Sequence, residues 1–168
     1  MHSKKGNITL IGMPGAGKST IGVILAKNLS LAFLDTDVLI QLRRQCPLQR
    51  LLEQYGHLGL RRIEEEEICQ LDVSRHVIAT GGSAAYSDRA MRHLQAVSHI
   101  VFLQASFPEL LRRIHNFDSR GIAKAPNQSF QELFAERQPL YQRYADLTIP
   151  CDQRSQDEIA EDIAARLD

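Results

Sequence analysis

The stretch from Gly12 to Thr20 constrains this 168-residue sequence more than any other feature. It reads Gly-Met-Pro-Gly-Ala-Gly-Lys-Ser-Thr and fits G-x-x-x-x-G-K-[ST], the pattern of a phosphate-binding loop. An apolar run at 8–11 precedes it, and an amphipathic run at 21–29 follows it. Glycines let the backbone wrap closely around a phosphate, and the helix start behind them presents free N–H groups to the anion. The sequence therefore predicts a strand, a phosphate-binding loop and a helix in succession.

The side chains of this loop have distinct expected roles. Lys18 brings a mobile positive charge to the outer phosphates of a nucleotide, and Ser19 offers a hydroxyl to Mg²⁺. The residues expected to hold the nucleotide are Gly15, Ala16, Gly17, Lys18, Ser19 and Thr20. The alternative, a glycine-rich turn before an unrelated helix, does not require this order of residues.

Strand and helix signals alternate along the rest of the chain. Strands are predicted at 8–11, 32–34, 76–80, 99–103 and 147–150, and helices at 20–28, 38–44, 48–55, 58–71, 87–94, 107–114, 130–143 and 155–167. Strands separated by helices pair in parallel and carry helices on both faces of the sheet. Ligands of such sheets bind outside the carboxyl ends of the strands, which is where the loop, Asp35, Asp37 and Gly81-Gly82 fall.

Composition narrows the class of protein. Lys plus Arg and Asp plus Glu number 20 each, so no basic excess indicates nucleic acid or an anionic membrane surface as a partner. No apolar run approaches the roughly 20 residues of a membrane span, and residues 1–7 are not followed by a signal-peptide core. The cysteines, Cys46, Cys69 and Cys151, have no paired spacing. We expect one domain spanning residues 1–168, working in the reducing cytoplasm.

Asp35 and Asp37 stand one residue apart at the end of the second predicted strand. If the strand continues, both side chains lie on one face. One carboxylate would then help to hold hydrated Mg²⁺ near Ser19, while the other takes the proton of an attacking hydroxyl. The alternative is helix capping, a common role of Asp at this position.

Two further segments are candidates for binding an acceptor. Arg61 and Glu64 are three residues apart on a predicted helix, so Glu64 could hold the Arg61 guanidinium in place to bind a carboxylate. Gly81 and Gly82 follow a strand and allow close backbone approach to a ligand, although a plain turn is an equal alternative.

The polar segment 116–129 is flanked by Arg112, Arg113 and Arg120. A polar flap with an arginine beside a phosphate site suggests a lid that excludes water and stabilises transferred charge. A surface loop without a role is the alternative.

Taken together, these motifs resemble the shikimate kinase family. The resemblance covers nearly the whole chain. It rests on the segments 12–20, 34–37 (Leu-Asp-Thr-Asp), 60–65 (Leu-Arg-Arg-Ile-Glu-Glu), 79–82 (Ala-Thr-Gly-Gly) and 137–141 (Arg-Gln-Pro-Leu-Tyr). The resemblance implies a three-layer α/β/α P-loop kinase fold with a five-stranded parallel sheet, a substrate-binding helical insert at about 35–62 and a lid at about 113–128. It also implies ATP and Mg²⁺ as cofactors and, as activity, phosphorylation of shikimate to shikimate 3-phosphate in aromatic amino-acid biosynthesis, by a monomer.

The resemblance also assigns roles to single residues. Asp37 matches the family's substrate-hydroxyl carboxylate and base, and Asp35 the residue near the metal. Arg61 and Arg137 match the two arginines that clamp the substrate carboxylate, and Gly82, with Gly81 beside it, the backbone contact to the acceptor. Three further matches concern the nucleotide: Arg120 as the lid arginine on the phosphates, and Arg112 and Arg154 as arginines around the adenine.

The sequence departs from the family pattern around the acceptor. The family's third glycine is Ser83 here, and its Arg-Pro-Leu-Leu lid reads Arg-Gly-Ile-Ala at 120–123. The family's phenylalanine before the clamp arginine is Leu60, and its second aromatic wall corresponds to Leu52. Because such changes alter pocket shape, a kinase of the same fold acting on another small hydroxy acid or amino acid is the alternative.

A non-catalytic nucleotide-binding module is a third hypothesis. The chain retains all five charged or metal-binding positions of the site: Lys18, Ser19, Asp35, Asp37 and Arg120. A module without turnover does not need this set, so we expect an enzyme.

Overall fold

The computed structural model of the chain describes residues 6–115 and 121–167. A single five-stranded sheet forms its centre, and the strand order is β2-β3-β1-β4-β5 with every neighbouring pair parallel. The strands are β1 Asn7–Ile11, β2 Ala32–Asp35, β3 His76–Ala79, β4 Ser98–Gln104 and β5 Leu147–Pro150. The predicted parallel α/β sheet is thereby confirmed.

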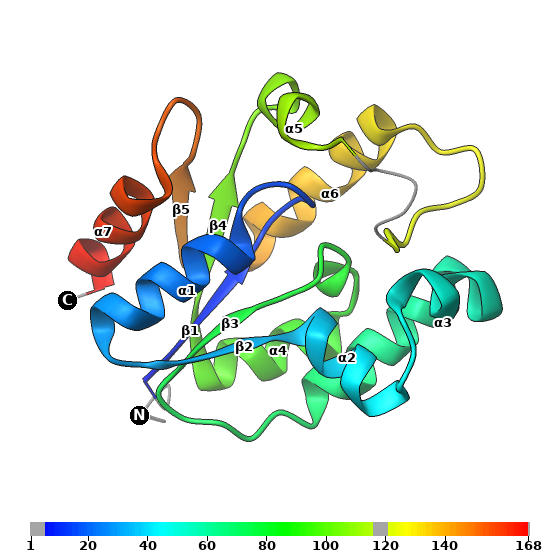
Figure 1. Cartoon of the computed structure of the whole chain (residues 1–168), viewed down its shortest axis with the longest axis horizontal. Coiled ribbons are helices and arrows are strands. Elements are labelled where there is room, and N and C mark those ends of the chain that lie inside the picture. The colour runs from blue at the N-terminus through cyan, green and yellow to red at the C-terminus, as the bar shows by residue number, and fades with distance from the viewer. Residues whose placement is uncertain (1–5, 116–120, 168) are drawn as a thin grey trace.

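Helices connect every consecutive pair of strands. The structure contains α1 Lys18–Leu29, α2 Thr36–Arg44, α3 Leu48–Cys69, the 3₁₀ turn η1 Ala84–Tyr86, α4 Asp88–Val97, α5 Phe107–Arg113, α6 Phe130–Tyr144 and α7 Gln156–Leu167. Figure 1 shows α1 and α7 on one face of the sheet and α4 and α6 on the other, while α2 and α3 project beyond the β2 side. This is the three-layer arrangement expected from the resemblance.

The central strands are apolar because helices cover both of their faces. All five residues of β1 are buried, and so are Ile100, Val101, Phe102 and Leu103 of β4. A second, smaller cluster of Ile40, Leu51, Leu60, Ile63 and Ala123 holds α2 and α3 together. The helices beside the sheet therefore have apolar packing of their own.

Asn7 and Thr9 are the polar residues among the buried residues of β1, and both polar atoms of the Asn7 side chain have hydrogen-bond partners. The amide nitrogen donates to the carbonyls of Val73 at 2.8 Å and Val97 at 3.1 Å, and the amide oxygen accepts from the backbone N–H of His76 at 2.9 Å. A buried amide costs little when it has such partners. Asn7 thus fixes the start of the strand that leads into the phosphate-binding loop.

The element boundaries differ from the predictions in few places. The helices predicted at 48–55 and 58–71 are one element, α3, with a kink at Gly56, whose φ of 70° and ψ of 177° are not helical. The predicted break at Gly56 is therefore confirmed. The turn η1 was not predicted, and α2 begins at Thr36, two residues early, because Asp35 caps it.

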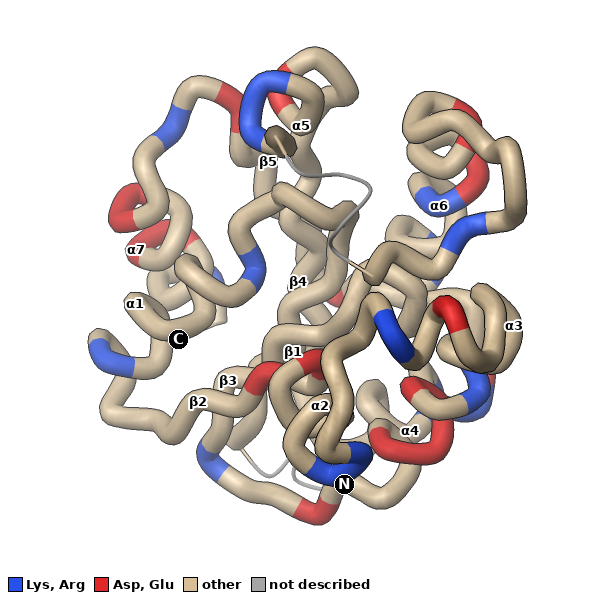
Figure 2. Tube along the Cα trace, turned by 45° about the vertical axis from the view of Figure 1, so that its right-hand side comes forward, with Lys and Arg blue, Asp and Glu red and all other residues tan. Residues whose placement is uncertain are grey.

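Charges are spread over the chain rather than gathered on one element, as Figure 2 shows, in keeping with 20 acidic and 20 basic side chains. Within the described residues, every helix is too short or too polar to cross a lipid bilayer.

Candidate active site

The carboxyl edge of the sheet opens into a cleft of about 730 Å³. The predicted site residues that line it are Gly15, Gly17, Lys18, Ser19, Thr20, Asp37, Gly81, Gly82, Arg112, Arg137 and Arg154. Ala16 is buried behind the loop, and Asp35 contacts the lining residue Ser19. Arg61 does not line the cleft and contacts Tyr86 and Glu136 beside it, and Arg120 lies outside the described residues. Segments far apart in the sequence therefore meet in one cavity.

The phosphate-binding loop has the backbone that its glycines predict. Gly15 and Gly17 have φ of 86° and 98°, values that side chains other than glycine rarely adopt. Gly17 caps α1 without a side-chain bond, so the first N–H groups of the helix have no capping side chain. An anion is the natural partner for such groups.

Lys18 is buried at the base of the cleft, and its ammonium group donates to the carbonyls of Gly12 at 2.7 Å and Met13 at 2.9 Å. Burial lowers the pKa of Lys18 to about 8, and the negative charge of Asp37 acts in the opposite direction. Phosphate oxygens would favour the charged form of this lysine.

Asp35 caps a helix, which is one of the two roles that the sequence left open, and it also contacts Ser19. Its Oδ1 accepts from the backbone N–H groups of Asp37 at 2.9 Å and Val38 at 3.2 Å, which caps α2. Its Oδ2 accepts from the Ser19 hydroxyl at 2.6 Å. The prediction that both aspartates share one strand face is wrong, because Asp37 already belongs to the first turn of α2.

Ser19 and Asp35 fit Mg²⁺ in their chemistry, since both supply oxygen. The described residues hold no cluster of three or more acidic, cysteine or histidine ligands for a metal ion. Mg²⁺ in kinases is typically held by one or two protein oxygens together with substrate phosphates and water. A hydroxyl beside a carboxylate at the phosphate-binding loop matches that donor set.

Two carboxylates flank Gly81. A Cβ added to Gly81 would lie 2.4 Å from Glu64 Oε1 and 2.7 Å from Asp37 Oδ1, so this position has no room for a side chain. Glu64 is buried, accepts a hydrogen bond from the Ser83 hydroxyl, and keeps its Oε1 without a hydrogen-bond partner among the described residues. Burial, and then the charge of Asp37, raises the pKa of Glu64 to about 7.

Glu64 is not the ion-pair partner of Arg61 that the spacing predicted. The Arg61 guanidinium lies 3.8 Å from a carboxylate oxygen of Glu136 and stacks on the Tyr86 ring, 3.5 Å from its centroid. The partners of Arg61 are therefore Glu136 of α6 and Tyr86 of η1, and not Glu64 of its own helix. Glu64 faces Ser83 and Gly81 instead.

Arg137 is buried to 1% exposure on α6 and reaches the same place. Its Nη2 donates to the carbonyl of Ala123 at 2.6 Å, and its Nη1 lies against Gly82, where an added Cβ would be 2.7 Å away. Its Cζ lies 5.3 Å from the Tyr86 ring centroid. The two arginines that the resemblance pairs therefore lie on one tyrosine ring.

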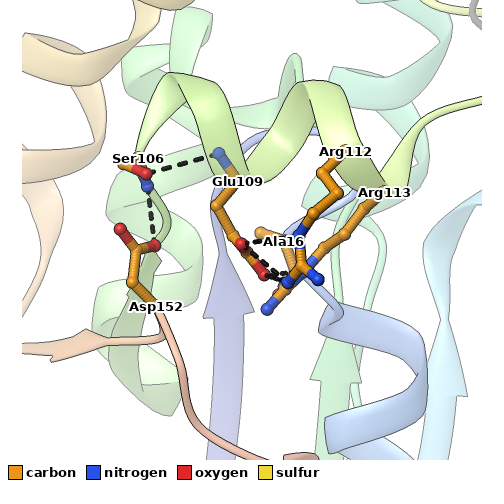
Figure 3. Close-up of polar contacts among 6 residues, drawn as sticks. All are labelled: Ala16, Ser106, Glu109, Arg112, Arg113 and Asp152. Atoms are coloured by element: carbon orange, nitrogen blue, oxygen red, sulfur yellow. Dashed lines mark hydrogen bonds and ion pairs between the residues drawn. The ribbon is translucent and has the colours of Figure 1, made fainter.

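Figure 3 shows the arginines of α5 held by one acid. Glu109 accepts from the Arg112 fork at 2.6 to 3.1 Å and from Arg113 Nε at 2.8 Å. Arg113 also donates to the Ala16 carbonyl at 3.3 Å, so it contacts the phosphate-binding loop directly, whereas the Arg112 side chain is 73% exposed. Arg154, which follows β5 and also lines the cleft, donates to Asp162 at 3.0 Å.

The described part of the expected lid is docked on α3. The Gly121 N–H donates to Gln49 Oε1 at 3.1 Å, and a Cβ on Gly121 would lie 2.7 Å from Leu48 Cβ. The apolar wall of the cleft consists of Ile40, Leu48, Leu60, Ile122 and Ala123. Leu52, expected in this wall, lines a separate cavity of about 290 Å³ instead.

Sequence reasoning missed several residues of this site. No sequence pattern singled out Tyr86 or Glu136, because each contacts the site through partners on other elements. Arg113 was considered only as a flank of the lid. The sequence shows that Ser83 brings a hydroxyl where the family has a glycine, but it does not show that this hydroxyl contacts Glu64.

The site combines a phosphate-binding loop, two aspartates one residue apart and two converging arginines. It lies at the carboxyl edge of a parallel sheet with the strand order β2-β3-β1-β4-β5. This combination defines a P-loop kinase of small molecules. The family model for shikimate kinase matches residues 14–168. The chain belongs to the shikimate kinase family.

Relatives and solved structures agree with this assignment. A shikimate kinase of Pseudomonas entomophila is 37% identical over 166 residues, covering 96% of this chain and 95% of the relative. The structure of shikimate kinase from Acinetobacter baumannii in complex with shikimate matches with a TM-score of 0.89 at 30% identity, covering 96% of this chain and 92% of that one. Shikimate kinase from Aquifex aeolicus matches with a TM-score of 0.81 at 27% identity, covering 96% and 95%.

Proposed function

We propose that this chain transfers the γ-phosphoryl group of ATP to a hydroxyl of shikimate, giving shikimate 3-phosphate and ADP. The observation that carries the proposal is the single cleft that joins the phosphate-binding loop to Asp37 and Arg137. Family membership supports the activity, and the Acinetobacter baumannii relative, which is similar over most of the chain, binds shikimate. A monomer working in the cytoplasm remains part of the proposal.

The nucleotide half of the site consists of the loop and its surroundings. The backbone of 12–20 and the ammonium of Lys18 would bind the phosphates. Ser19 and Asp35 would hold Mg²⁺, which neutralises phosphate charge when bound. Arg112 and Arg154 line the side of the cleft proposed for the adenine, and Arg120 is proposed as the lid arginine within the segment 113–128.

The acceptor half lies between α2, α3, β3 and α6, and we assign the insert at about 35–62 to it. Arg61 and Arg137 would bind the carboxylate of shikimate through charge-assisted hydrogen bonds. Gly81 and Gly82 let the acceptor approach the backbone, because any side chain there would fill the space.

Asp37 performs the proton transfer in this proposal. The acceptor hydroxyl oxygen attacks the γ-phosphorus, the bond to the bridging oxygen of ADP breaks, and the hydroxyl proton passes to the Asp37 carboxylate. The negative charge of Asp37 raises the pKa of Lys18, and both residues line the same cleft. The proposed base therefore lies within electrostatic reach of the lysine that would bind the phosphates.

A kinase of the same fold for another small hydroxy acid is the second candidate. It is favoured by the Ser83 hydroxyl, bonded to Glu64 where the family has glycine, and by Leu60 in place of an aromatic wall. Such changes in pocket shape are worth about 1–3 kcal/mol of discrimination between related substrates.

A coupled assay of ADP release over a panel of small hydroxy acids, with shikimate first, tests the proposal. We expect turnover with shikimate and loss of transfer in Asp37→Asn at unchanged folding. Turnover with other hydroxy acids and none with shikimate would favour the second candidate. Nucleotide binding without product from any acceptor would indicate a non-catalytic module.

A further inference from the structure

Tyr86 lies at the point where the acceptor arginines meet. It is the last residue of η1, the turn that follows Gly81 and Gly82. Its backbone N–H donates to the Ser83 carbonyl at 3.1 Å, and the next residue, Ser87, caps α4 through a bond to the Ala90 N–H. The backbone on both sides of the Tyr86 ring is therefore fixed.

The ring of Tyr86 lies close to two cations from different helices. The Cζ atom of Arg61, on α3, is 3.5 Å from the ring centroid, and that of Arg137, on α6, is 5.3 Å away. Burial lowers the pKa of Arg61, and the positive charge of Arg137 also lowers it. Because the face of an aromatic ring attracts guanidinium groups, Tyr86 offsets part of this repulsion.

The hydroxyl of Tyr86 adds polar links between the same side chains. It donates to Glu136 Oε1 and accepts from Arg137 Nε at 3.4 Å. Glu136 also lies 3.8 Å from Arg61 Nη2 and accepts from Gln128 at 2.8 Å. We call Arg61, Tyr86, Glu136 and Arg137 the Tyr86 cluster; with two guanidinium groups and one carboxylate it carries one excess positive charge.

The cluster places one guanidinium nitrogen at the cleft and leaves another without a hydrogen-bond partner among the described residues. Nη1 of Arg137 lies against Gly82 at the cleft wall, while its Nη2 and Nε are bonded to Ala123 and Tyr86. The Nε of Arg61 is buried without a hydrogen-bond partner among the described residues. An anion with two oxygens would meet both the excess charge and these donors.

We infer that Tyr86 is a positioning residue: it holds the Arg61 and Arg137 guanidinium groups together so that both bind the carboxylate of the acceptor. The inference rests on the proposed function. Tyr86 acts through the arginines rather than on the reacting atoms, so it sets acceptor affinity and leaves the nucleotide half and the transfer step unchanged. Its ring contributes more than its hydroxyl, since the ring contacts both cations.

Steady-state kinetics of Tyr86→Leu and Tyr86→Phe, with shikimate and ATP varied separately, test this role. We expect Tyr86→Leu to raise the KM for shikimate about 10-fold, with the kcat and the KM for ATP each within about threefold of wild type. Tyr86→Phe keeps the ring and should raise the KM for shikimate only about threefold. Tyr144→Phe, which removes a tyrosine hydroxyl bonded to Asp88 outside the cluster and the cleft, is the matched control and should change neither KM.

The outcomes separate this inference from the proposed function. Wild-type protein that does not phosphorylate shikimate would overturn the proposed function. Wild-type turnover with an unchanged KM for shikimate in Tyr86→Leu would overturn the role of Tyr86 alone. An equal rise in both KM values, or a loss confined to kcat, would also overturn it, because a purely structural defect would not single out the acceptor.

Discussion

Glu64 has an environment that opposes its own ionisation. It is 4% exposed, it lies beside the Asp37 carboxylate across Gly81, and only one of its oxygens has a hydrogen bond, from Ser83. Burial and the neighbouring negative charge favour the neutral acid, while the Ser83 bond favours the carboxylate. The site therefore carries an electrostatic cost in stability, as functional sites often do.

Replacing Glu64 by Gln should remove this cost. Since the pKa of Glu64 in the folded protein, about 7, exceeds the ordinary glutamate value of 4.5, the stability that the protonated acid contributes is complete below about pH 4.5. It is lost as the pH rises through 7. We expect Glu64→Gln to be more stable than wild type by about 2 kcal/mol at pH 8 and nearly equal to it at pH 5. Urea denaturation at both pH values measures this.

Glu66→Gln is the control for that experiment, because Glu66 lies on the same helix with its side chain 58% exposed and paired only with Arg44 at the surface. Its effect should be small at both pH values. Parallel pH profiles for wild type and Glu64→Gln would contradict the prediction.

The lowered pKa of Lys18 leads us to expect proton uptake when a nucleotide binds. Its pKa of about 8, lowered by burial, leaves it partly neutral near that pH, and bound phosphates would restore the charge. We expect uptake of about half a proton per nucleotide near pH 8 and much less near pH 6.5. Calorimetry of ATP binding in two buffers of different ionisation enthalpy measures the uptake. The control Lys27→Met, at the exposed end of the same helix, should retain the proton uptake. Equal heats of ATP binding in both buffers at pH 8 would contradict the prediction.

At the scale of elements, α6 carries one of the two arginines proposed to bind the acceptor, Arg137. It presents Glu136 and Arg137 to the Tyr86 cluster, and Tyr141, whose hydroxyl donates to the Gly82 carbonyl. A capping box starts it: Ser129 accepts from the Glu132 N–H at 3.1 Å, and Glu132 accepts from the Ser129 N–H at 3.0 Å. The cap stabilises a helix that contains an interior proline, Pro139, and that carries the proposed acceptor residue Arg137.

Ser129→Ala should lower the free energy of unfolding by about 1 kcal/mol, because the first turn of α6 loses one capping bond. Arg137 is two turns further along, so the KM for shikimate should stay within about twofold. Ser155→Ala removes the corresponding bond of α7, which carries no proposed acceptor residue, and should cost a similar amount. A large change in the KM for shikimate in Ser129→Ala would show that the cap also positions the site.

At the scale of the whole molecule, the fold separates the two halves of the cleft. The phosphate-binding loop joins β1 to α1, whereas the acceptor arginines come from α3 and α6. Figure 1 shows α3 set apart from α1 and the loop that precedes it. The proposed binding of donor and acceptor therefore depends on different elements.

Arg61→Ala should weaken binding of the acceptor and leave binding of ATP nearly unchanged. The loss of one charge-assisted contact, worth roughly 1.5–3 kcal/mol, should raise the KM for shikimate by about 10- to 100-fold. The Kd for ATP should change little, because Arg61 belongs to α3 and contacts Tyr86 and Glu136 rather than the phosphate-binding loop. Calorimetry with ATP alone, beside steady-state kinetics, provides the comparison. An equal loss of ATP affinity would contradict the division of the cleft.

The sequence by itself determined the strand–loop–helix unit around Gly12 to Thr20, the order of helices and strands, and the polar residues at the sheet edge. These features depend on local rules: glycines where φ is positive, apolar periodicity, and the fact that parallel strands end at one edge. The family motifs added the predictions for Asp37, Arg61 and Arg137. Both arginines lie near the Tyr86 ring and Asp37 lies beside Gly81, and the roles of all three stay predictions.

Only the tertiary structure decided how those side chains are paired. Spacing along one helix suggested Glu64 as the partner of Arg61, but packing gave Arg61 to Tyr86 and Glu136, and Glu64 to Ser83. Tyr86 and its cluster partners come from η1, α3 and α6, which meet only when the sheet brings distant segments together. Such contacts leave no local pattern in the sequence, because their geometry is set by how whole helices pack rather than by neighbouring residues.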